Sequence, residues 1–138
     1  MALRKNAKIE LIKSVPLFSS CSKKELEAIA SQADELDVPA GKTLTKEGAR
    51  GREFMVIVNG SAEVRKKGRK INTLGSGDFL GEIALISGGP RTATVTTTSE
   101  TDLLVLTDRA FSAVTKKMPS IHASVVKALS ERLQSDAL

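Results

Sequence analysis

The sequence predicts an α+β fold, mainly β, in which an antiparallel β-roll or jelly roll carries helices at both ends. Two observations predict it. Charged segments with helical periodicity occupy the two ends of the chain, whereas closely spaced glycines divide the middle into short alternating or apolar runs. The chain has 138 residues, of which 41% are apolar, and this is enough to bury a core. We therefore expect a single domain over residues 1–138.

The N-terminal part, residues 1–35, is expected to be helical. Lys5–Lys13 places apolar side chains among charges at helical spacing, and a proline follows shortly afterwards. Ser22, with Glu25 three residues later, has the pattern of a capping box. A second helix is therefore predicted from about Lys23 to Gln32.

Residues 36–108 are expected to form the β-roll. Asn59-Gly60 is a strong signal for a tight turn, because both residues tolerate positive φ. The predicted strands are Lys42–Thr45, Glu53–Val58, Ser61–Arg65, Lys70–Leu74, Thr92–Thr97 and Asp102–Thr107.

Residues 109–138 return to a helical period. Phe111 and Val114 indicate one short helix, and Pro119 begins a longer one that runs to about Gln134, since proline is favourable in a first turn. The apolar residues of this last helix recur at steps of three and four, so one face must be covered by another part of the fold.

The composition argues against several classes of protein. No apolar run approaches the roughly 20 residues that a membrane span requires, and the N-terminus lacks the apolar stretch of a signal peptide. We expect a cytoplasmic protein that does not bind a membrane. One cysteine, Cys21, and one histidine, His122, are too few for a metal cluster. No pair of nucleophile and base indicates catalysis, so we expect no catalytic residues and no enzyme.

The net charge of +5 raises the question of an acidic partner or nucleic acid. Much of the local excess falls on one predicted hairpin tip around Gly68. Aromatic residues for base stacking are scarce, and no recognition helix follows, so we interpret the tip as a solvated turn and expect no nucleic acid at this domain. The cations of the tip are Arg65, Lys66, Lys67, Arg69 and Lys70.

Residues 77–95 depart from the surrounding alternation and suggest a ligand site. Gly81 allows close approach of a ligand, and a helical turn over Glu82–Ile86 would present free N–H groups where helices attract phosphate. Arg91 follows a proline and precedes small residues, an arrangement that suits bidentate binding of phosphate. Glu82 is compatible with a phosphate if it accepts from a ribose hydroxyl. A carboxylate for the sugar and a guanidinium for the phosphate together predict a nucleotide.

Residues 79–95 resemble the phosphate-binding cassette of cyclic nucleotide-binding domains, which bacterial cAMP receptor proteins, cyclic nucleotide-dependent kinases and cyclic nucleotide-gated channels share. The family pattern is close to Phe-Gly-Glu-(Leu/Ile)-Ala-Leu, a short loop, and Arg-(Ala/Ser/Thr)-Ala-(Thr/Ser)-Val. This chain has Leu80-Gly81-Glu82-Ile83-Ala84-Leu85 and Arg91-Thr92-Ala93-Thr94-Val95. The resemblance covers nearly the whole chain and implies a ligand sensor with an internal cassette helix.

The resemblance also implies individual roles. Glu82 would accept from the ribose 2′-hydroxyl, Arg91 would pair with the cyclic phosphate, and Gly81 would let the sugar approach. Backbone N–H groups of the cassette would complete the phosphate cage, an apolar wall would lie beside the base, and Ile83 would relay cassette movement to the final helix. The implied binding residues are Gly81, Glu82, Ile83, Ala84, Arg91, Thr92 and Ala93, with Val64 and Leu74 as the wall.

Two departures from the family pattern concern packing. Leu80 stands where the family usually has Phe, and the final helix contains no aromatic residue to stack on the base. Glu131 and Arg132 are candidates for the missing lid, with a solvated helix surface as the competing interpretation.

Thr92 bears on the identity of the base. In kinase-type relatives Thr at this place is associated with cGMP, whereas bacterial cAMP sensors also carry Ser or Thr. We expect cAMP from the bacterial precedent, with cGMP as the alternative, and movement of the C-terminal helix as the output. Two other functions stay open: a ligand-free roll that binds proteins, and the sensor of a DNA-binding regulator whose effector is absent, lies on another chain or lies outside this segment. The oligomeric state is not predicted.

Overall fold

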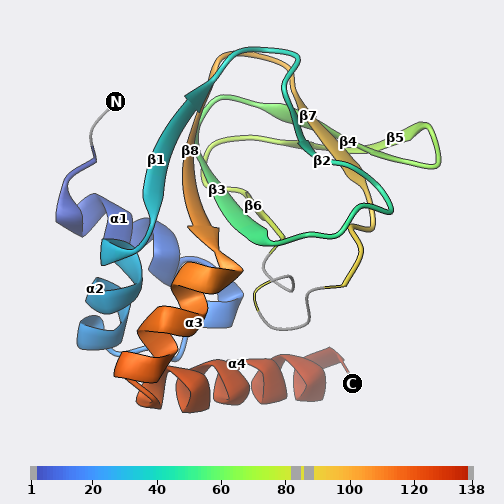
Figure 1. The fold of residues 1–138 in the computed structure, drawn as a ribbon. Helices are drawn as coiled ribbons and strands as arrows, with labels where there is room; N and C mark the ends of the chain where they lie inside the picture. Colours follow the sequence, from blue (N-terminus) through green and yellow to red (C-terminus); the bar gives the residue numbers. More distant parts are fainter. Residues whose placement is uncertain (1–2, 82–84, 86–88, 137–138) are drawn as a thin grey trace.

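The computed structural model describes residues 3–81, 85 and 89–136. Helices gather on one side of a set of strands (Figure 1). The helical elements are α1 (Lys5–Lys13), the 3-10 turn η1 (Pro16–Phe18), α2 (Lys23–Ser31), α3 (Asp108–Lys117) and α4 (Ser120–Asp136). The strands are β1 (Asp34–Val38), β2 (Thr43–Thr45), β3 (Glu53–Asn59), β4 (Ala62–Lys66), β5 (Arg69–Leu74), β6 (Phe79–Leu80), β7 (Thr94–Thr97) and β8 (Thr101–Thr107).

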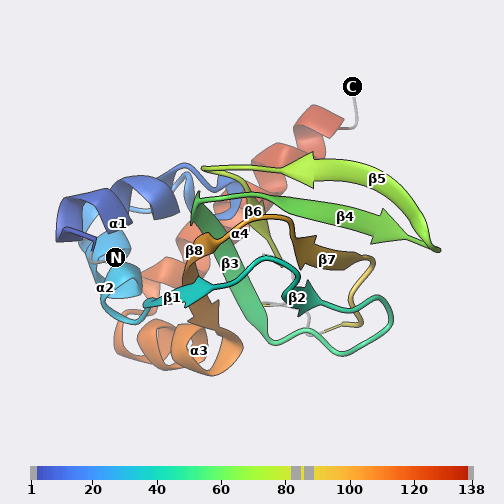
Figure 2. The ribbon, with the colours of Figure 1, turned by 90° about the horizontal axis from the view of Figure 1, so that it is seen from above.

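The strands form two four-stranded antiparallel sheets. The first sheet has the order β1-β8-β3-β6 and the second the order β2-β7-β4-β5. Figure 2 shows the second sheet extending away from α1, α2 and α3, which lie beside the first sheet. This arrangement confirms the predicted α+β roll with helices at both ends.

Two strands were not expected from the sequence. β1 begins at Asp34, two residues before the start expected for the roll, and pairs with β8 along its length. Its burial pattern explains the omission, because only Val38 is buried while Leu36 is 49% exposed. The two-residue strand β6 pairs with β3 and is too short to show a period.

The capping box predicted at the start of α2 is confirmed. Ser22 Oγ accepts from the backbone N of Glu25 at 3.2 Å, and Glu25 Oε1 accepts from the backbone N of Ser22 at 2.8 Å. Glu25 Oε1 also accepts from Ser124 Oγ on α4 at 2.8 Å, so one carboxylate joins the N-terminal and C-terminal helices. Burial acts to raise the pKa of Glu25, but hydrogen bonds from Ser22, Ser120 and Ser124 together outweigh burial and hold that pKa below its ordinary value.

The buried apolar side chains fall into two cores. The helical core lies between the helices and one face of the first sheet, and the roll core lies between the two sheets. The helical core consists of Ile9, Ile12, Val15, Leu17, Phe18, Leu26, Ile29, Ala30, Ala33, Phe54, Val56, Leu85, Leu104, Leu106, Phe111, Val114, Ile121 and Val125. The roll core consists of Val38, Met55, Ile57, Ala62, Val95, Leu103 and Val105, with Leu44, Val64, Leu74 and Leu80 half-buried against it.

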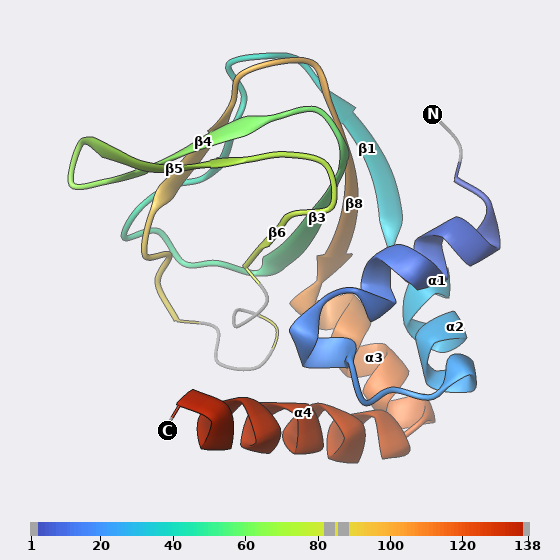
Figure 3. The same cartoon turned by 180° about the vertical axis from the view of Figure 1, so that it is seen from behind.

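Helix α4 packs on the helical core with part of the apolar face that the sequence predicted. Ile121 and Val125 are buried there, while Val126 is 46% exposed on another face. The helix packs against η1 and α3 (Figure 3). None of the helices in the described part of the chain is long and apolar enough to cross a membrane.

Candidate functional site

The backbone of Arg91 is fixed by the loop between β2 and β3. The backbone N of Arg91 donates to the carbonyl of Ala49 at 2.7 Å, and the backbone N of Gly48 donates to the carbonyl of Arg91 at 2.8 Å. Pro90 forms an isolated β-bridge with Arg50. The backbone of Arg91, the arginine that the sequence analysis singled out, is therefore held in place just before β7 begins.

The side chain of Arg91 passes between two glycines. A Cβ built on Gly51 would collide with Nε, Cδ and Cζ of Arg91, and a Cβ built on Gly81 would collide with Nη1 and lie 2.5 Å from the carbonyl oxygen of Glu53. Gly81 also has a φ of +78°, a region that other residues rarely adopt. The structure thus brings Gly81 and Arg91 together. Because neither Gly51 nor Gly81 has a side chain, there is room for the side chain of Arg91 between them.

The guanidinium is half-buried and oriented by the backbone. Arg91 Nη2 donates to the carbonyl oxygen of Glu53 at 2.6 Å, which uses one of the five N–H donors of the group. Burial lowers the pKa of Arg91, and the nearby carboxylate of Glu53 opposes that effect. A cation held in this way, with further donors in a planar fork, can bind an anion through two parallel hydrogen bonds.

The strand that follows Arg91 begins later in the sequence than predicted. β7 begins at Thr94, not at Thr92, because Thr92 is exposed and precedes the first ladder pair. The carbonyl of Ala93, which is half-buried, accepts from Thr45 Oγ1 at 3.0 Å, and Thr94 Oγ1 accepts from the backbone N of Glu47 at 2.9 Å. These bonds join the Arg91 segment to β2 and the loop after it.

The expected apolar wall lies on β4 and β5. Val64 stands opposite Val95 in the pairing of β4 with β7, and Leu74 stands opposite Ala62 in the pairing of β4 with β5. Both Val64 and Leu74 are half-buried against the roll core. Part of the apolar surface of both side chains therefore stays accessible to solvent or to a ligand.

The departure at Leu80 has a structural counterpart. Phe79 packs toward the helical core, where its ring centroid lies 6.3 Å from that of Phe54, while Leu80 packs against the roll core. Adjacent residues of a strand point to opposite faces. The aromatic residue, one place earlier than in the family pattern, therefore packs against the helical core, and a leucine takes the face toward the roll core.

Some expected site residues lie outside the described residues. Glu82, Ile83 and Ala84, and with them the expected cassette helix, belong to this group, and the side chains of Glu131 and Arg132 on α4 do too. Leu85, between the two gaps, is described: it is 8% exposed and belongs to the helical core.

Sequence reasoning missed Gly51 and the carbonyl of Glu53. Gly51 has no positive φ, so no backbone rule requires glycine there; its reason is the passage of the Arg91 side chain. The carbonyl of Glu53 acts through its backbone, which leaves no signal in the residue type. Only the spatial approach of the β2–β3 loop to Arg91 reveals either one.

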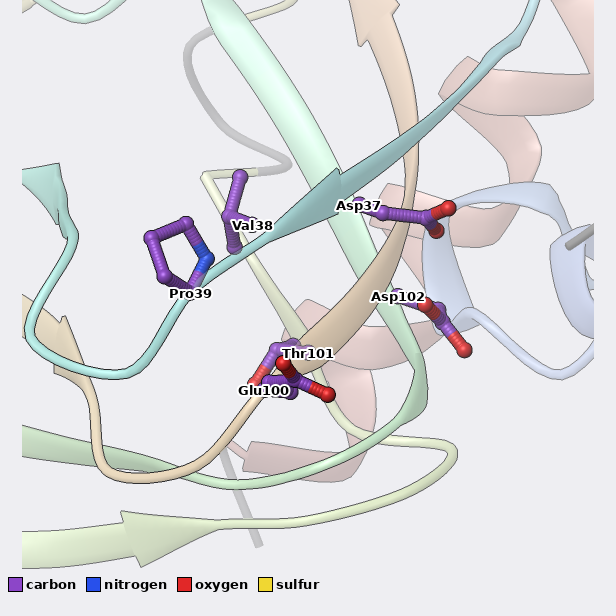
Figure 4. Close-up of a pocket in the computed structure, with 6 residues that line it drawn as sticks. All are labelled: Asp37, Val38, Pro39, Glu100, Thr101 and Asp102. Atoms are coloured by element: carbon purple, nitrogen blue, oxygen red, sulfur yellow. The ribbon is translucent and has the colours of Figure 1, made fainter.

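A cavity of about 320 Å³ lies away from these residues, where β1 ends and β8 begins (Figure 4). Asp37 and Asp102 face each other across the two strands, and their shared hydrogen bond lowers the pKa of Asp37 and raises that of Asp102. Among the described residues, no group of three His, Cys, Asp or Glu side chains could hold a metal ion. The lining residues are Asp37, Val38, Pro39, Glu100, Thr101 and Asp102, none of which belongs to the predicted site.

Known proteins share this architecture. Residues 35–118 match the family described as cyclic nucleotide-binding domain. A cyclic nucleotide-gated potassium channel of Rhizobium etli is 35% identical over 123 residues, which are 89% of this chain and 34% of the channel. The chain thus spans about a third of that relative's length.

Two solved structures extend the similarity to three dimensions. The N-terminal domain of a transcriptional regulator from Streptomyces coelicolor has a TM-score of 0.83 at 26% identity, with 92% of each chain covered. The regulatory domain of Toxoplasma gondii PKA, solved with cAMP, has a TM-score of 0.73 at 31% identity, covering 80% of this chain and 44% of that one.

Proposed function

Because the chain belongs to the cyclic nucleotide-binding domain family, we propose that it binds a 3′,5′-cyclic purine nucleotide and acts as a regulatory sensor without catalytic activity. The observation that carries this proposal is the guanidinium of Arg91, oriented by the carbonyl of Glu53 and flanked by Gly51 and Gly81. Such a group suits one compact phosphate diester better than the extended charge of a nucleoside triphosphate.

We propose cAMP as the ligand. The relative from Toxoplasma gondii, 31% identical, was solved with cAMP. Thr92 is exposed beside Arg91, so its hydroxyl is accessible to a base of either kind, and cGMP is the alternative. In this scheme Glu82 binds the ribose, the N–H groups of Ile83, Ala84 and Thr92 assist Arg91, and Val64 and Leu74 contact the base.

The proposed output runs through Leu85. This residue follows the proposed phosphate-binding N–H groups and packs in the same core as Ile121 and Val125 of α4. If a phosphate moves the cassette, Leu85 must change its contacts, and α4 then finds a different packing partner. A ligand shifts such an equilibrium only through contacts that differ between the two states. Glu131 and Arg132 on the same helix are the proposed lid.

Calorimetric titration with cAMP, cGMP and 5′-AMP tests the binding proposal. We expect heat with a cyclic nucleotide and at least tenfold weaker binding of 5′-AMP. Arg91→Ala should weaken binding by roughly tenfold to a hundredfold for each charge-assisted bond lost. Arg69→Ala is the matched control, since it removes the same side chain from an exposed position. Absence of heat from either cyclic nucleotide on folded protein would overturn the proposal.

Amide exchange with and without nucleotide tests the output. We expect protection to change along Ser120–Asp136 as well as at Gly81 and Arg91. An unchanged exchange rate in α4 would leave a binding domain without the proposed switch.

A second candidate function is the sensor part of a transcriptional regulator. The similarity to the Streptomyces coelicolor domain over 92% of both chains favours it. In that case the effector would be a protein or domain beyond this segment, and the nucleotide titration above would give the same result. A ligand-free protein-interaction module predicts the opposite, no heat with any nucleotide.

A further inference from the structure

The turn between β4 and β5 holds an unusual concentration of positive charge. We call residues 65–70 the basic hairpin; five of its six residues are cations, and the sixth is Gly68. The net charge of the whole chain is +5, so the remaining 132 residues carry equal numbers of acidic and basic side chains. The net positive charge of the chain therefore equals the charge of the basic hairpin alone.

The basic hairpin projects from the molecule. In Figures 1 and 3 the β4–β5 ribbon extends beyond the other strands, on the side away from the helices. Residues 65–73 are all exposed. A flat anionic surface would meet these cations before it met the body of the domain.

The backbone of the hairpin is well defined. Lys67 and Gly68 have φ of 51° and 77°, which is the geometry of a tight two-residue turn. Arg65 Nη1 donates to the carbonyl of Gly68 at 3.2 Å, and the backbone N of Lys67 donates to Glu47 Oε1 at 2.9 Å. The cations are thus carried on an ordered frame, which reduces the entropy lost on binding.

The pairing of the cations is unfavourable for the isolated hairpin. Arg65 stands opposite Lys70, and Lys66 stands opposite Arg69. Like charges directly opposite each other destabilise a strand pair. Glu63 reduces the repulsion in the pair of Arg65 and Lys70, because it forms a 3.0 Å ion pair with Arg65. Lysines also protect the open edge that β5 forms, but two like-charged pairs cost stability, and an anionic partner would offset that cost.

Ile71 indicates which kind of anionic partner fits. The pairing slips between Val64 and Arg65, so Ile71 has no residue opposite it, and it is 57% exposed. A purely polar anionic partner offers no contact for an exposed isoleucine. The interface of an anionic bilayer, in contrast, can bind both the cations and an apolar side chain. The hairpin contains no aromatic residue on which a base could stack.

In place of the solvated turn and the missing membrane partner expected from the sequence, we propose that the basic hairpin docks the domain on an anionic lipid surface, with its cations among the headgroups and Ile71, the next residue along β5, at the apolar boundary. Each cation near such a surface adds attraction that falls off within a Debye length. This docking would use other residues than the proposed phosphate contact, since the contacts described for Arg91 are made by Gly48, Ala49, Gly51, Glu53 and Gly81.

Co-sedimentation with vesicles tests the docking. The probe is phosphatidylcholine with about 30% phosphatidylserine, compared with phosphatidylcholine alone. We expect binding to the mixed vesicles that is lost at high salt. Lys66→Glu with Lys67→Glu should weaken binding by at least about tenfold. Lys23→Glu with Lys24→Glu makes the same change in charge at exposed positions in the first turn of α2, where acids are favourable, and should change binding by less than about twofold.

Two further measurements make the lipid assignment falsifiable. Ile71→Ser keeps the charge and should still weaken vesicle binding about threefold; an unchanged affinity would overturn the lipid assignment. Tighter binding to duplex DNA or to polyglutamate than to the vesicles at equal salt would likewise assign the hairpin to nucleic acid or to an acidic protein. Equal losses from the two lysine pairs would show that total charge, not the hairpin, is responsible.

Discussion

The helical core and the roll core differ in how completely they are closed. In the helical core, Val15, Phe18 and Ile29 are 0% exposed and helices pack on it from several directions. The roll core also has fully buried members such as Ile57, but Val64 and Leu74, which pack against it, are only half-buried, and Val64 pairs with the strand β7 that follows Arg91. We infer that burial in the helical core supplies much of the stability of the domain, and we propose that the half-buried wall of the roll is where a ligand would find apolar surface.

The largest expected effect is on the helical core. The ring of Phe18 packs edge-to-face on Phe54 and tilted on Phe111, at centroid distances of 5.8 and 6.0 Å. Phe18→Ala should lower the free energy of unfolding by about 3–5 kcal/mol, because a large cavity would remain between three elements. Urea unfolding measures the loss. Leu74→Ala, at the half-buried wall, should lower it by only about 1 kcal/mol. Losses of equal size would remove the contrast between the two cores.

A pair of valines sharpens the comparison. Val56 on β3 is buried in the helical core, and Val64 on β4 is half-buried in the roll. Val56→Ala should lower the free energy of unfolding by about 2 kcal/mol and leave nucleotide affinity unchanged. Val64→Ala should have the reverse pattern, with affinity several-fold weaker in calorimetry and stability reduced by less than about 1 kcal/mol. Affinity that falls for Val56→Ala alone would contradict the assignment of the wall.

The glycine beside Arg91 gives a smaller and more local effect. Gly51→Ala places a Cβ against the Arg91 side chain, so the guanidinium must move from the Glu53 carbonyl. We expect nucleotide binding about tenfold weaker, since a displaced fork loses its hydrogen-bond geometry. Gly75→Ala is the control: nothing lies within 4 Å of its Cβ and its φ is not positive. Equal affinity of the two variants would show that Arg91 does not need its present position.

The smallest expected effect is the pH dependence of the contact between the two ends of the chain. The folded pKa of Glu25 lies below its ordinary value, so its carboxylate stabilises the fold above about pH 4.3, the unfolded value. That contribution is lost as pH falls through the folded pKa. Glu25→Gln should therefore be less stable than the unchanged protein at neutral pH, with a difference that closes on acidification. Urea unfolding across pH measures the difference, and a pH-independent gap would assign the loss to packing.

The fold was largely predictable because its signals are local. The capping box at Ser22 and Glu25, the glycine turns and the period of the last helix each depend on neighbouring residues. β1 was not predicted because four of its five residues are exposed and three are acidic, which hides the alternation. The cassette motif predicted that Gly81 and Arg91 belong to one site, and the structure brings the two residues together. Gly51 could not be predicted, since its requirement arises from a side chain 40 positions away.

The helical core has a consequence for synthesis on the ribosome. Its members run from Ile9 in α1 to Val125 in α4, and Glu25 bonds to Ser124, 99 residues later. The first helices therefore emerge long before the helix that covers them. During that interval the core lacks Ile121 and Val125 of α4, whereas the hairpin of β4 and β5 can pair at once, since its contacts close within a short stretch. A nascent chain stalled before Ser120 should expose the apolar side of its N-terminal helices, and chaperones that bind such surfaces would find it there.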